Sequence, residues 1–300
     1  MFFKQFYDNN LSQASYLVGC QRTGEAIIID PVRDLTKYME VADSEGFTIT
    51  QAAETHIHAD FASGIRDVAE QLNANVYVSG EGDDELSYRN MPEQTHFVKH
   101  QDIIHVGNIK LEVLHTPGHT PESISFLLTD EGGGSSVPMG IFSGDFIFVG
   151  DIGRPDLLEK SVQIEGSTEV SAKQMYQSLE SVKDLPDYIQ IWPGHGAGSP
   201  CGKALGAVPM STLGYEKINN WAFNVTDESK FVEILTSNQP APPHHFAQMK
   251  KINQFGMNMY QPYDVFPSLD NARIAFDLRS KEAFHGCLLY TSPSPRDKRQ

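Results

Sequence analysis

The sequence predicts an α/β fold in which several strands end near one site. Four short apolar or small-residue segments have the length of strands, at 49–53, 110–115, 139–142 and 189–192. Each is followed within a few residues by a histidine or an aspartate, and a helix is expected over 64–72. Loops that follow strands are where rigid α/β scaffolds present their chemistry. The pattern therefore indicates one site built from several loops.

The first segment leads to a pair of histidines. His56 and His58 are separated by one residue, and Asp60 follows them. In extended backbone, residues two apart point to the same face, so both imidazoles are able to face one site. The chain has 11 histidines, so this pair alone is weak evidence for a metal.

Each of the other three segments adds a potential metal ligand. These are His119 in a Pro-Gly-His-Thr sequence, Asp145 in Ser-Gly-Asp, and His195 in Pro-Gly-His. Because all four motifs stand just past a predicted strand, the fold is able to bring them together. The sequence therefore predicts one metal site with open coordination positions.

The four motifs together resemble the metallo-β-lactamase superfamily, from about residue 1 to residue 221. The resemblance implies a four-layer αβ/βα sandwich with the metal at one edge, between two sheets. Superfamily hydrolases that hold two zinc ions, such as glyoxalase II, usually have the sequence H-x-H-x-D-H. Phe61 stands at the last position here and has no donor atom. A second metal is therefore expected to lack a ligand.

Within the superfamily, the chain is most similar to persulfide dioxygenases, which bind one ferrous iron. On this resemblance the iron ligands are His56, His119 and Asp145. Two imidazoles and a carboxylate leave three coordination positions free for substrate and dioxygen. Zinc has no redox chemistry, so the oxidation requires iron.

The remaining polar residues of the motifs are expected to surround these ligands. On the resemblance, His58, Asp60 and His195 orient the ligands or hold water. The alternative is a buried, hydrogen-bonded cluster that serves the scaffold alone.

Two further residues are candidate catalytic groups. An arginine at the place of Arg154 contacts the carboxylate of the thiol cosubstrate in persulfide dioxygenases; the alternative is a salt bridge to Asp151 or Asp156. Cys201 lies on a Gly/Pro-rich loop near the expected metal. In persulfide dioxygenase–sulfurtransferase fusions, which this chain resembles, a cysteine at this place is suited to carry or accept a persulfide sulfur. A nearby Lys203 is expected to favour its thiolate.

Three helices are expected after the motifs. Amphipathic patterns predict helices over 213–223 and 228–236, with Asp227 as the N-cap of the second. A third helix follows a proline-rich break and runs to about residue 255. His244 and His245 stand at its start and are interpreted as helix-end or packing residues, not as metal ligands.

Segments at 1–6, 12–16, 24–33, 150–156 and 273–286 resemble bacterial fusions of a persulfide dioxygenase with rhodanese sulfurtransferase modules. This resemblance predicts a catalytic domain at 1–236, a helix and linker at 237–271, and the start of a truncated rhodanese-like domain at 272–286. Residues 287–300 lose that pattern abruptly and resemble translated sequencing-adapter read-through, so a non-native tail is expected there. The aromatic linker is expected to pack across domains or at a subunit contact, which favours a homo-oligomer.

Composition excludes some partners. The chain has 39 acidic and 23 basic side chains, a net charge of −16, which argues against nucleic acid and anionic membrane surfaces. No apolar run approaches the ~20 residues that span a bilayer, and no signal sequence is evident, so a cytoplasmic protein is expected. Three cysteines cannot form a disulfide framework, and Cys20 is expected in the core.

The predicted function is oxidation of the terminal sulfur of a low-molecular-weight thiol persulfide to sulfite, with O2 and one Fe(2+) per chain, in sulfide detoxification. The thiol is glutathione, coenzyme A or a similar compound, and thiosulfate formation requires the missing rhodanese module. One alternative is a thioester hydrolase of the glyoxalase II type with Zn(2+). Another is a non-catalytic sulfur-binding or scaffold protein.

Overall fold

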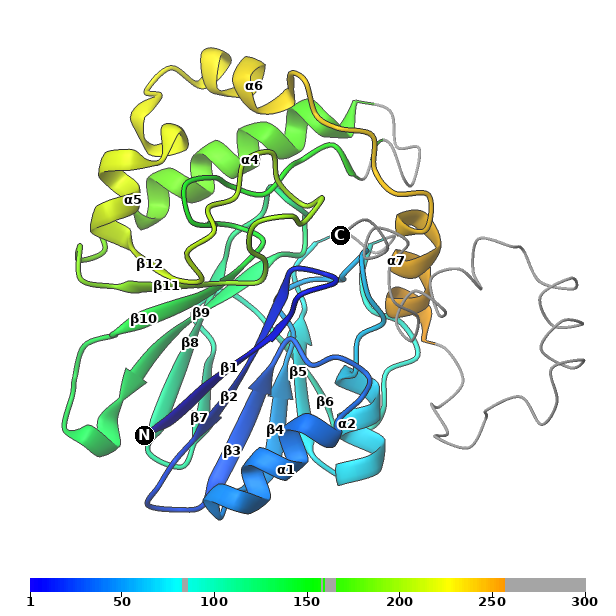
Figure 1. Cartoon of the computed structure of the whole chain (residues 1–300), viewed down its shortest axis with the longest axis vertical. Coiled ribbons are helices and arrows are strands. Elements are labelled where there is room, and N and C mark those ends of the chain that lie inside the picture. The colour runs from blue at the N-terminus through cyan, green and yellow to red at the C-terminus, as the bar shows by residue number, and fades with distance from the viewer. Residues whose placement is uncertain (83–85, 158, 160–165, 257–300) are drawn as a thin grey trace, which may run out of the picture.

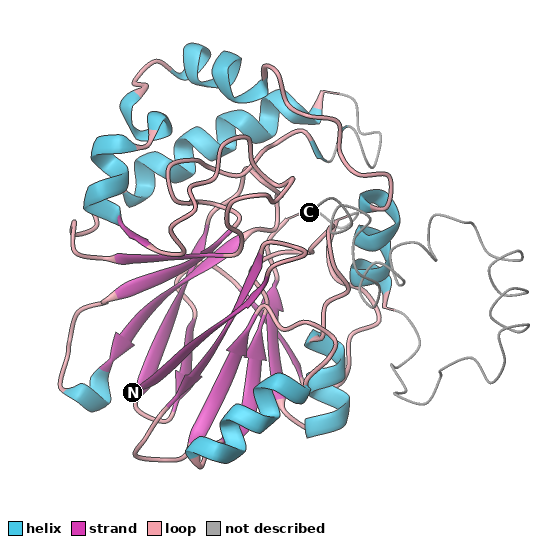
Figure 2. Cartoon of the chain, in the orientation of Figure 1, coloured by secondary structure: helices cyan, strands magenta, loops and turns pink. Residues whose placement is uncertain are grey.

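Two six-stranded sheets lie face to face, and helices cover their outer faces (Figures 1 and 2). The structure, a computed structural model, describes residues 1–82, 86–157, 159 and 166–256. The layers run helix, sheet, sheet, helix, so the predicted four-layer sandwich is confirmed. The predicted rhodanese-like segment at 272–286 and the tail at 287–300 lie outside the described residues.

The first sheet is antiparallel at one edge and parallel through the rest. Its strands, in spatial order, are β1 (Phe2–Asp8), β2 (Gln13–Gly19), β3 (Glu25–Ile29), β4 (Thr48–Ala53), β5 (Asn75–Ser79) and β6 (Thr95–Val98). Pairing is antiparallel from β1 to β3 and parallel from β3 to β6. Parallel strands need crossover connections. Helices α1 (Thr36–Glu45) and α2 (Ile65–Leu72) provide two of them and pack on β4.

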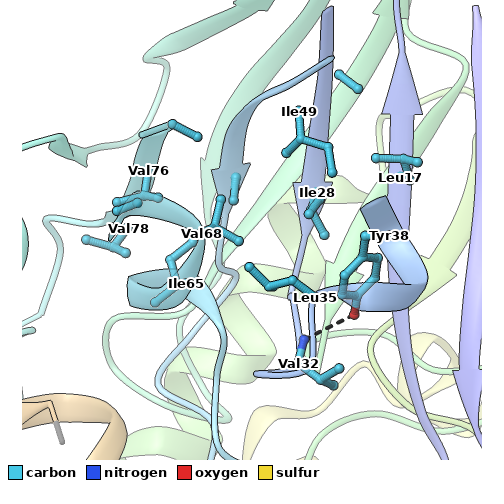
Figure 3. Packing of buried hydrophobic residues seen from close by; sticks show 14 of the residues in the cluster. Leu17, Ile28, Val32, Leu35, Tyr38, Ile49, Ile65, Val68, Val76 and Val78 are labelled. Carbon is cyan, nitrogen blue, oxygen red and sulfur yellow. Dashed lines mark hydrogen bonds between the residues drawn. The ribbon is translucent and has the colours of Figure 1, made fainter. Parts of the chain in front are cut away.

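Apolar side chains fill the layer between these helices and the first sheet (Figure 3). Leu17 and Ile28 point from β2 and β3 into this layer, where α1 contributes Tyr38 and α2 contributes Val68. The buried Tyr38 hydroxyl accepts a hydrogen bond from the Val32 backbone N–H at 3.1 Å, so burial leaves its polar end paired.

The second sheet is mixed and carries the other helices. Its strands, in spatial order, are β12 (Ser211–Thr212), β11 (Gln190–Pro193), β10 (Gly140–Gly144), β9 (Ile124–Asp130), β8 (Ile109–His115) and β7 (Ile103–Val106). Helices α4 (Ser167–Val182) and α6 (Glu228–Thr236) pack together over its outer face. Two 3-10 turns, Glu131–Gly133 and Trp221–Asn224, and helix α5 (Leu213–Asn219) complete this half.

The main core lies between the two sheets. Tyr16 and Ile29 from the first sheet pack with Phe126, Phe142 and Trp192 from the second, and all five are at most 2% exposed. Burying a large apolar side chain contributes roughly 1.5–3 kcal/mol. This apolar sandwich is the rigid base on which the loops at its edge are held.

Most of the predicted elements are confirmed within a residue or two. The four segments that precede the motifs form β4, β8, β10 and β11, and the helix expected over 64–72 is α2. Asp227 caps α6 by accepting a hydrogen bond from the Lys230 N–H at 2.7 Å. His245 stands at the N-cap of α7 (Phe246–Phe255), also as predicted. No helix in the described ranges is both long and apolar enough to cross a bilayer.

The single helix expected over 213–223 is wrong. Asn220 is extended, with ψ of 124°, and its side chain accepts a hydrogen bond from the Ala222 N–H at 3.1 Å. Asparagine competes with helical hydrogen bonding in this way. The segment is therefore split into α5 and a 3-10 turn.

Candidate metal centre

The loops after β4, β8, β10 and β11 meet at one edge of the sandwich. The backbone N–H of Ile124 donates to the Thr55 carbonyl at 2.8 Å, which ties the loop after β4 to the second sheet. Gly194 donates to the Gly144 carbonyl at 2.8 Å, which joins the loops after β11 and β10. The motifs predicted to form one site are thereby brought together.

The His56 imidazole is held so that Nε2 faces the centre of the site. The Thr55 hydroxyl donates to the Asp30 carboxylate, with Oγ1 3.0 Å from Oδ2. That hydroxyl has one proton, so its oxygen accepts from the Nδ1–H of His56 at 3.0 Å. Nε2 therefore carries the lone pair. Burial and the neighbouring His58 hold the pKa of His56 well below its usual value, so the ring is neutral.

The His119 imidazole is oriented in the same way. Its Nδ1–H donates to the backbone carbonyl of Arg154 at 2.9 Å, so Nε2 again carries the lone pair. Burial lowers the pKa of His119. A neutral imidazole fixed through one nitrogen is the usual form of a histidine that binds metal.

Asp145 completes the group with an oxygen that has no hydrogen bond. Its Oδ1 accepts from Nδ1 of His195 at 2.7 Å, whereas Oδ2 is buried without a hydrogen-bond partner among the described residues. Oδ2 lies 3.8 Å from Nε2 of His56 and 3.4 Å from Nε2 of His119. Although burial alone would raise the pKa of Asp145, His195 lowers it below the usual range, so the carboxylate is charged.

These three atoms fit a metal cation. Two imidazole lone pairs and a carboxylate oxygen lie within 4.8 Å of one another, and all three side chains are buried. Lone pairs facing each other in a dry site repel unless a cation lies between them. Two histidines and one carboxylate suit a divalent metal and leave coordination positions open.

His195 is a bridge between two carboxylates. Its Nε2 lies 2.7 Å from Asp60 Oδ2 and its Nδ1 lies 2.7 Å from Asp145 Oδ1. Although burial alone would lower the pKa of His195, the two carboxylates raise it well above the usual value. The charged ring donates both protons, and it thereby fixes the orientation of Asp145.

His58 pairs with carboxylates outside this group. Its Nε2 lies 3.2 Å from Asp30 Oδ1 and 3.8 Å from Glu54 Oε1. Burial alone would lower the pKa of His58, but Asp30 and Glu54 raise it to about 9. Asp30 adopts the left-handed conformation, with φ of 52°, directly after β3. It binds both the Thr55 hydroxyl and His58, and so supports the two histidines of the first motif.

Phe61 follows Asp60 in the first motif and packs against His58. Its ring is 1% exposed and lies 4.4 Å from that of His58, centroid to centroid. Its backbone carbonyl accepts a hydrogen bond from the Asn253 side chain at 2.8 Å. The position therefore contributes packing and no donor atom.

Cys201 lies at the site, but as a buried thiol. It is 2% exposed, and its Sγ lies within 4.8 Å of ligand atoms of Asp60 and His195. Burial, together with Asp145 and Asp60, raises the pKa of the thiol well above its usual value. The expectation that Lys203 favours a thiolate is wrong, because the Lys203 ammonium donates to carbonyls at the end of α6 instead.

Arg154 is engaged within the protein. Its guanidinium binds both oxygens of Asp156 at 2.7 Å and donates to the carbonyls of Pro200 at 3.1 Å and Pro240 at 2.6 Å. The side chain is 0% exposed. The structure thus shows the salt bridge to Asp156, which is one of the two alternatives that the sequence left open.

The motifs do not include several residues around the site. Asp30 directly follows β3 at the same sheet edge, so the pattern of polar residues after strands already contained that signal. Glu122 stands on the loop after β8, three residues past His119, whereas Lys250 and Asn253 carry no such signal because they lie on α7, far along the chain.

Replacing Gly153 by alanine is expected to disturb the site. An added Cβ would lie 1.9 Å from the backbone oxygen of Asp145, so that loop must move. We expect a loss of roughly 1–3 kcal/mol of stability and weaker metal binding. Urea unfolding and a metal titration measure the two effects. Gly150→Ala is the control for metal binding alone, since nothing lies within 4 Å of its added Cβ, whereas its φ of 77° strains alanine and so affects stability. Equal metal affinity in both variants would contradict the prediction.

Comparisons with known proteins agree with this geometry. The sequence model described as the metallo-beta-lactamase superfamily matches residues 8–195. A crystal structure of a metallo-beta-lactamase from Staphylococcus aureus subsp. aureus COL is 70% identical, with a TM-score of 0.84 over 95% of this chain and 82% of that chain.

Two less similar proteins carry names of different kinds, ETHE1 and hydroxyacylglutathione hydrolase. The crystal structure of ETHE1 from Myxococcus xanthus is 28% identical, with a TM-score of 0.68 over 85% of this chain and 98% of that chain. A hydroxyacylglutathione hydrolase from Polaromonas sp. (strain JS666 / ATCC BAA-500) is 28% identical over 239 residues, which is 76% of this chain and 82% of that protein.

Proposed function

Because the chain belongs to the metallo-beta-lactamase superfamily, we propose that it is a persulfide dioxygenase with one ferrous iron per chain. It oxidises the terminal sulfur of a low-molecular-weight thiol persulfide to sulfite with O2. The observation that carries this proposal is the group of His56, His119 and Asp145, whose lone pairs converge while Phe61 contributes no further donor. The likeness to ETHE1, a persulfide dioxygenase, supports it.

In this proposal the three side chains hold the iron, which supplies the redox chemistry with dioxygen that the side chains lack. The protein holds the ligands in place. The Arg154 carbonyl keeps Nε2 of His119 free of a proton, and His195 keeps one oxygen of Asp145 engaged while the other faces the site. Both contacts fix the orientation and the protonation of the metal-binding atoms before metal or substrate binds.

An apolar group of residues borders the site next to Cys201. Phe148, Leu157 and Phe246 pack with Cys201 and Ala59, and all five are at most 8% exposed. These side chains exclude water from the sulfur-bearing end of the substrate. Cys201 would contact that end as a neutral thiol, because its pKa is raised by burial.

A zinc-dependent thioester hydrolase is the second candidate. The similarity to a hydroxyacylglutathione hydrolase favours it, and zinc accepts the same imidazole and carboxylate ligands. Such a hydrolase would work with one zinc ion. A second zinc ion would have to bind without a ligand from Phe61.

Oxygen uptake is the measurement that separates these functions. Protein loaded with ferrous iron without air is given glutathione persulfide or coenzyme A persulfide. We expect oxygen consumption with sulfite as product, and its loss in His119→Ala. If the iron-loaded protein consumes no oxygen while the zinc-loaded protein hydrolyses S-lactoylglutathione, the hydrolase replaces the dioxygenase.

A further inference from the structure

Helix α7 belongs to the metal centre, although its residues lie outside the 8–195 family match. The Asn253 side-chain amide donates to the carbonyls of His58 and Phe61, both at 2.8 Å, and its oxygen accepts from the Ser63 N–H at 3.0 Å. These contacts fasten α7 to the loop that carries His56. Figure 1 shows α7 apart from the helices of the second sheet, and Arg66 in the first turn of α2 donates to the carbonyls of Asn253 and Gln254.

One turn before Asn253, α7 places a lysine in the interior. Lys250 is 5% exposed, and the partner of its ammonium within the described part of the chain is Glu122, with Nζ 3.8 Å from Oε1. This distance is longer than a hydrogen bond. Glu122 is 0% exposed, and its Oε2 has no partner among the described residues. An ammonium has three donor hydrogens, and this one contact does not use them all.

The Glu122 carboxylate, 3.8 Å from this ammonium, lies against the first motif. Glu122 follows His119 by three residues, and its Oε1 also accepts from the Ile57 N–H at 3.1 Å, next to His56. Lys250 is thus held between the two motifs that provide the imidazoles.

We propose that Lys250 binds the anionic, sulfur-bearing end of the substrate beside the metal centre. The inference rests on the proposed function and deepens it by naming the charge of the substrate and the residue that recognises it. An ammonium is a compact point charge that suits a single-atom anion such as a terminal sulfur. Arg154, the cation that the sequence favoured for substrate recognition, is occupied by Asp156.

The test measures anion binding without turnover. Inorganic sulfite, the expected product, is titrated calorimetrically into the iron-loaded full chain without air, and KM and kcat are measured separately for glutathione persulfide. We expect Lys250→Met to weaken sulfite binding and raise KM about 10- to 100-fold, with a smaller change in kcat. Lys250→Arg should restore most of the affinity. Lys251→Met, an exposed neighbour, should bind sulfite as the parent protein does.

A second variant controls for folding, because Lys250→Met leaves Glu122 as a buried charge without its cation. Glu122→Gln combined with Lys250→Met removes both charges and should fold, as measured by urea unfolding. If this folded double variant binds sulfite as tightly as the parent protein, or if the parent binds none, the inference is overturned. Lys250-dependent sulfite binding without oxygen uptake would support the anion site and reject the dioxygenase.

Discussion

Replacing Asp145 by asparagine will remove tight metal binding and, with it, oxygen uptake. The substitution keeps the size of the side chain but removes the negative charge whose Oδ2 faces two imidazole lone pairs. It also removes one of the two carboxylates that hold the charged His195. We expect metal affinity to fall by at least about 100-fold, because changes to groups that only support a ligand already cost 10- to 100-fold.

Metal content after dialysis against a weak chelator measures this effect. Asp187→Asn is the matched control, since that carboxylate is exposed and pairs with Lys217 far from the motifs. Asp145→Asn protein that retains one metal per chain, while remaining folded, would show that the ligand group is wrong.

The metal ligands were predictable because each follows a strand. His56, His119 and Asp145 stand just after β4, β8 and β10. Strands β8 and β10 flank β9 in the second sheet, and the bond from the Ile124 N–H to the Thr55 carbonyl joins the loop after β4 to that sheet. Both signals are local in the sequence: an apolar segment predicts the strand, and a polar residue soon after it predicts the ligand. The same reasoning reaches Asp30 after β3.

The contacts from α7 were not predictable in this way. Asn253 binds the carbonyl of His58 across 195 positions of the chain, and no local pattern encodes which loop a distant helix will meet. The partner of Arg154 was open for a related reason, since Asp151 and Asp156 are both near in sequence. The structure uses Asp151 to accept from Trp221 Nε1 at 2.9 Å, which leaves Asp156 for the guanidinium.

Because Arg154 pairs with Asp156 in the interior, we expect its replacement mainly to reduce the stability of the fold. The two bonds to Asp156 at 2.7 Å are made by a side chain that is 0% exposed. In Arg154→Met, the Asp156 carboxylate loses this cation in the interior. Breaking a buried pair from one side costs about 3–5 kcal/mol, whereas removing both charges costs much less.

We therefore expect Arg154→Met to lower the free energy of unfolding by about 3–5 kcal/mol in urea, and Arg154→Met combined with Asp156→Leu to recover much of the loss. The His119 contact should persist in the double variant, because it is made by the backbone carbonyl of residue 154. KM for the persulfide should then stay close to that of the parent protein. An Arg154→Met protein with parental stability and a strongly raised KM would instead show that this guanidinium turns from Asp156 to bind the cosubstrate.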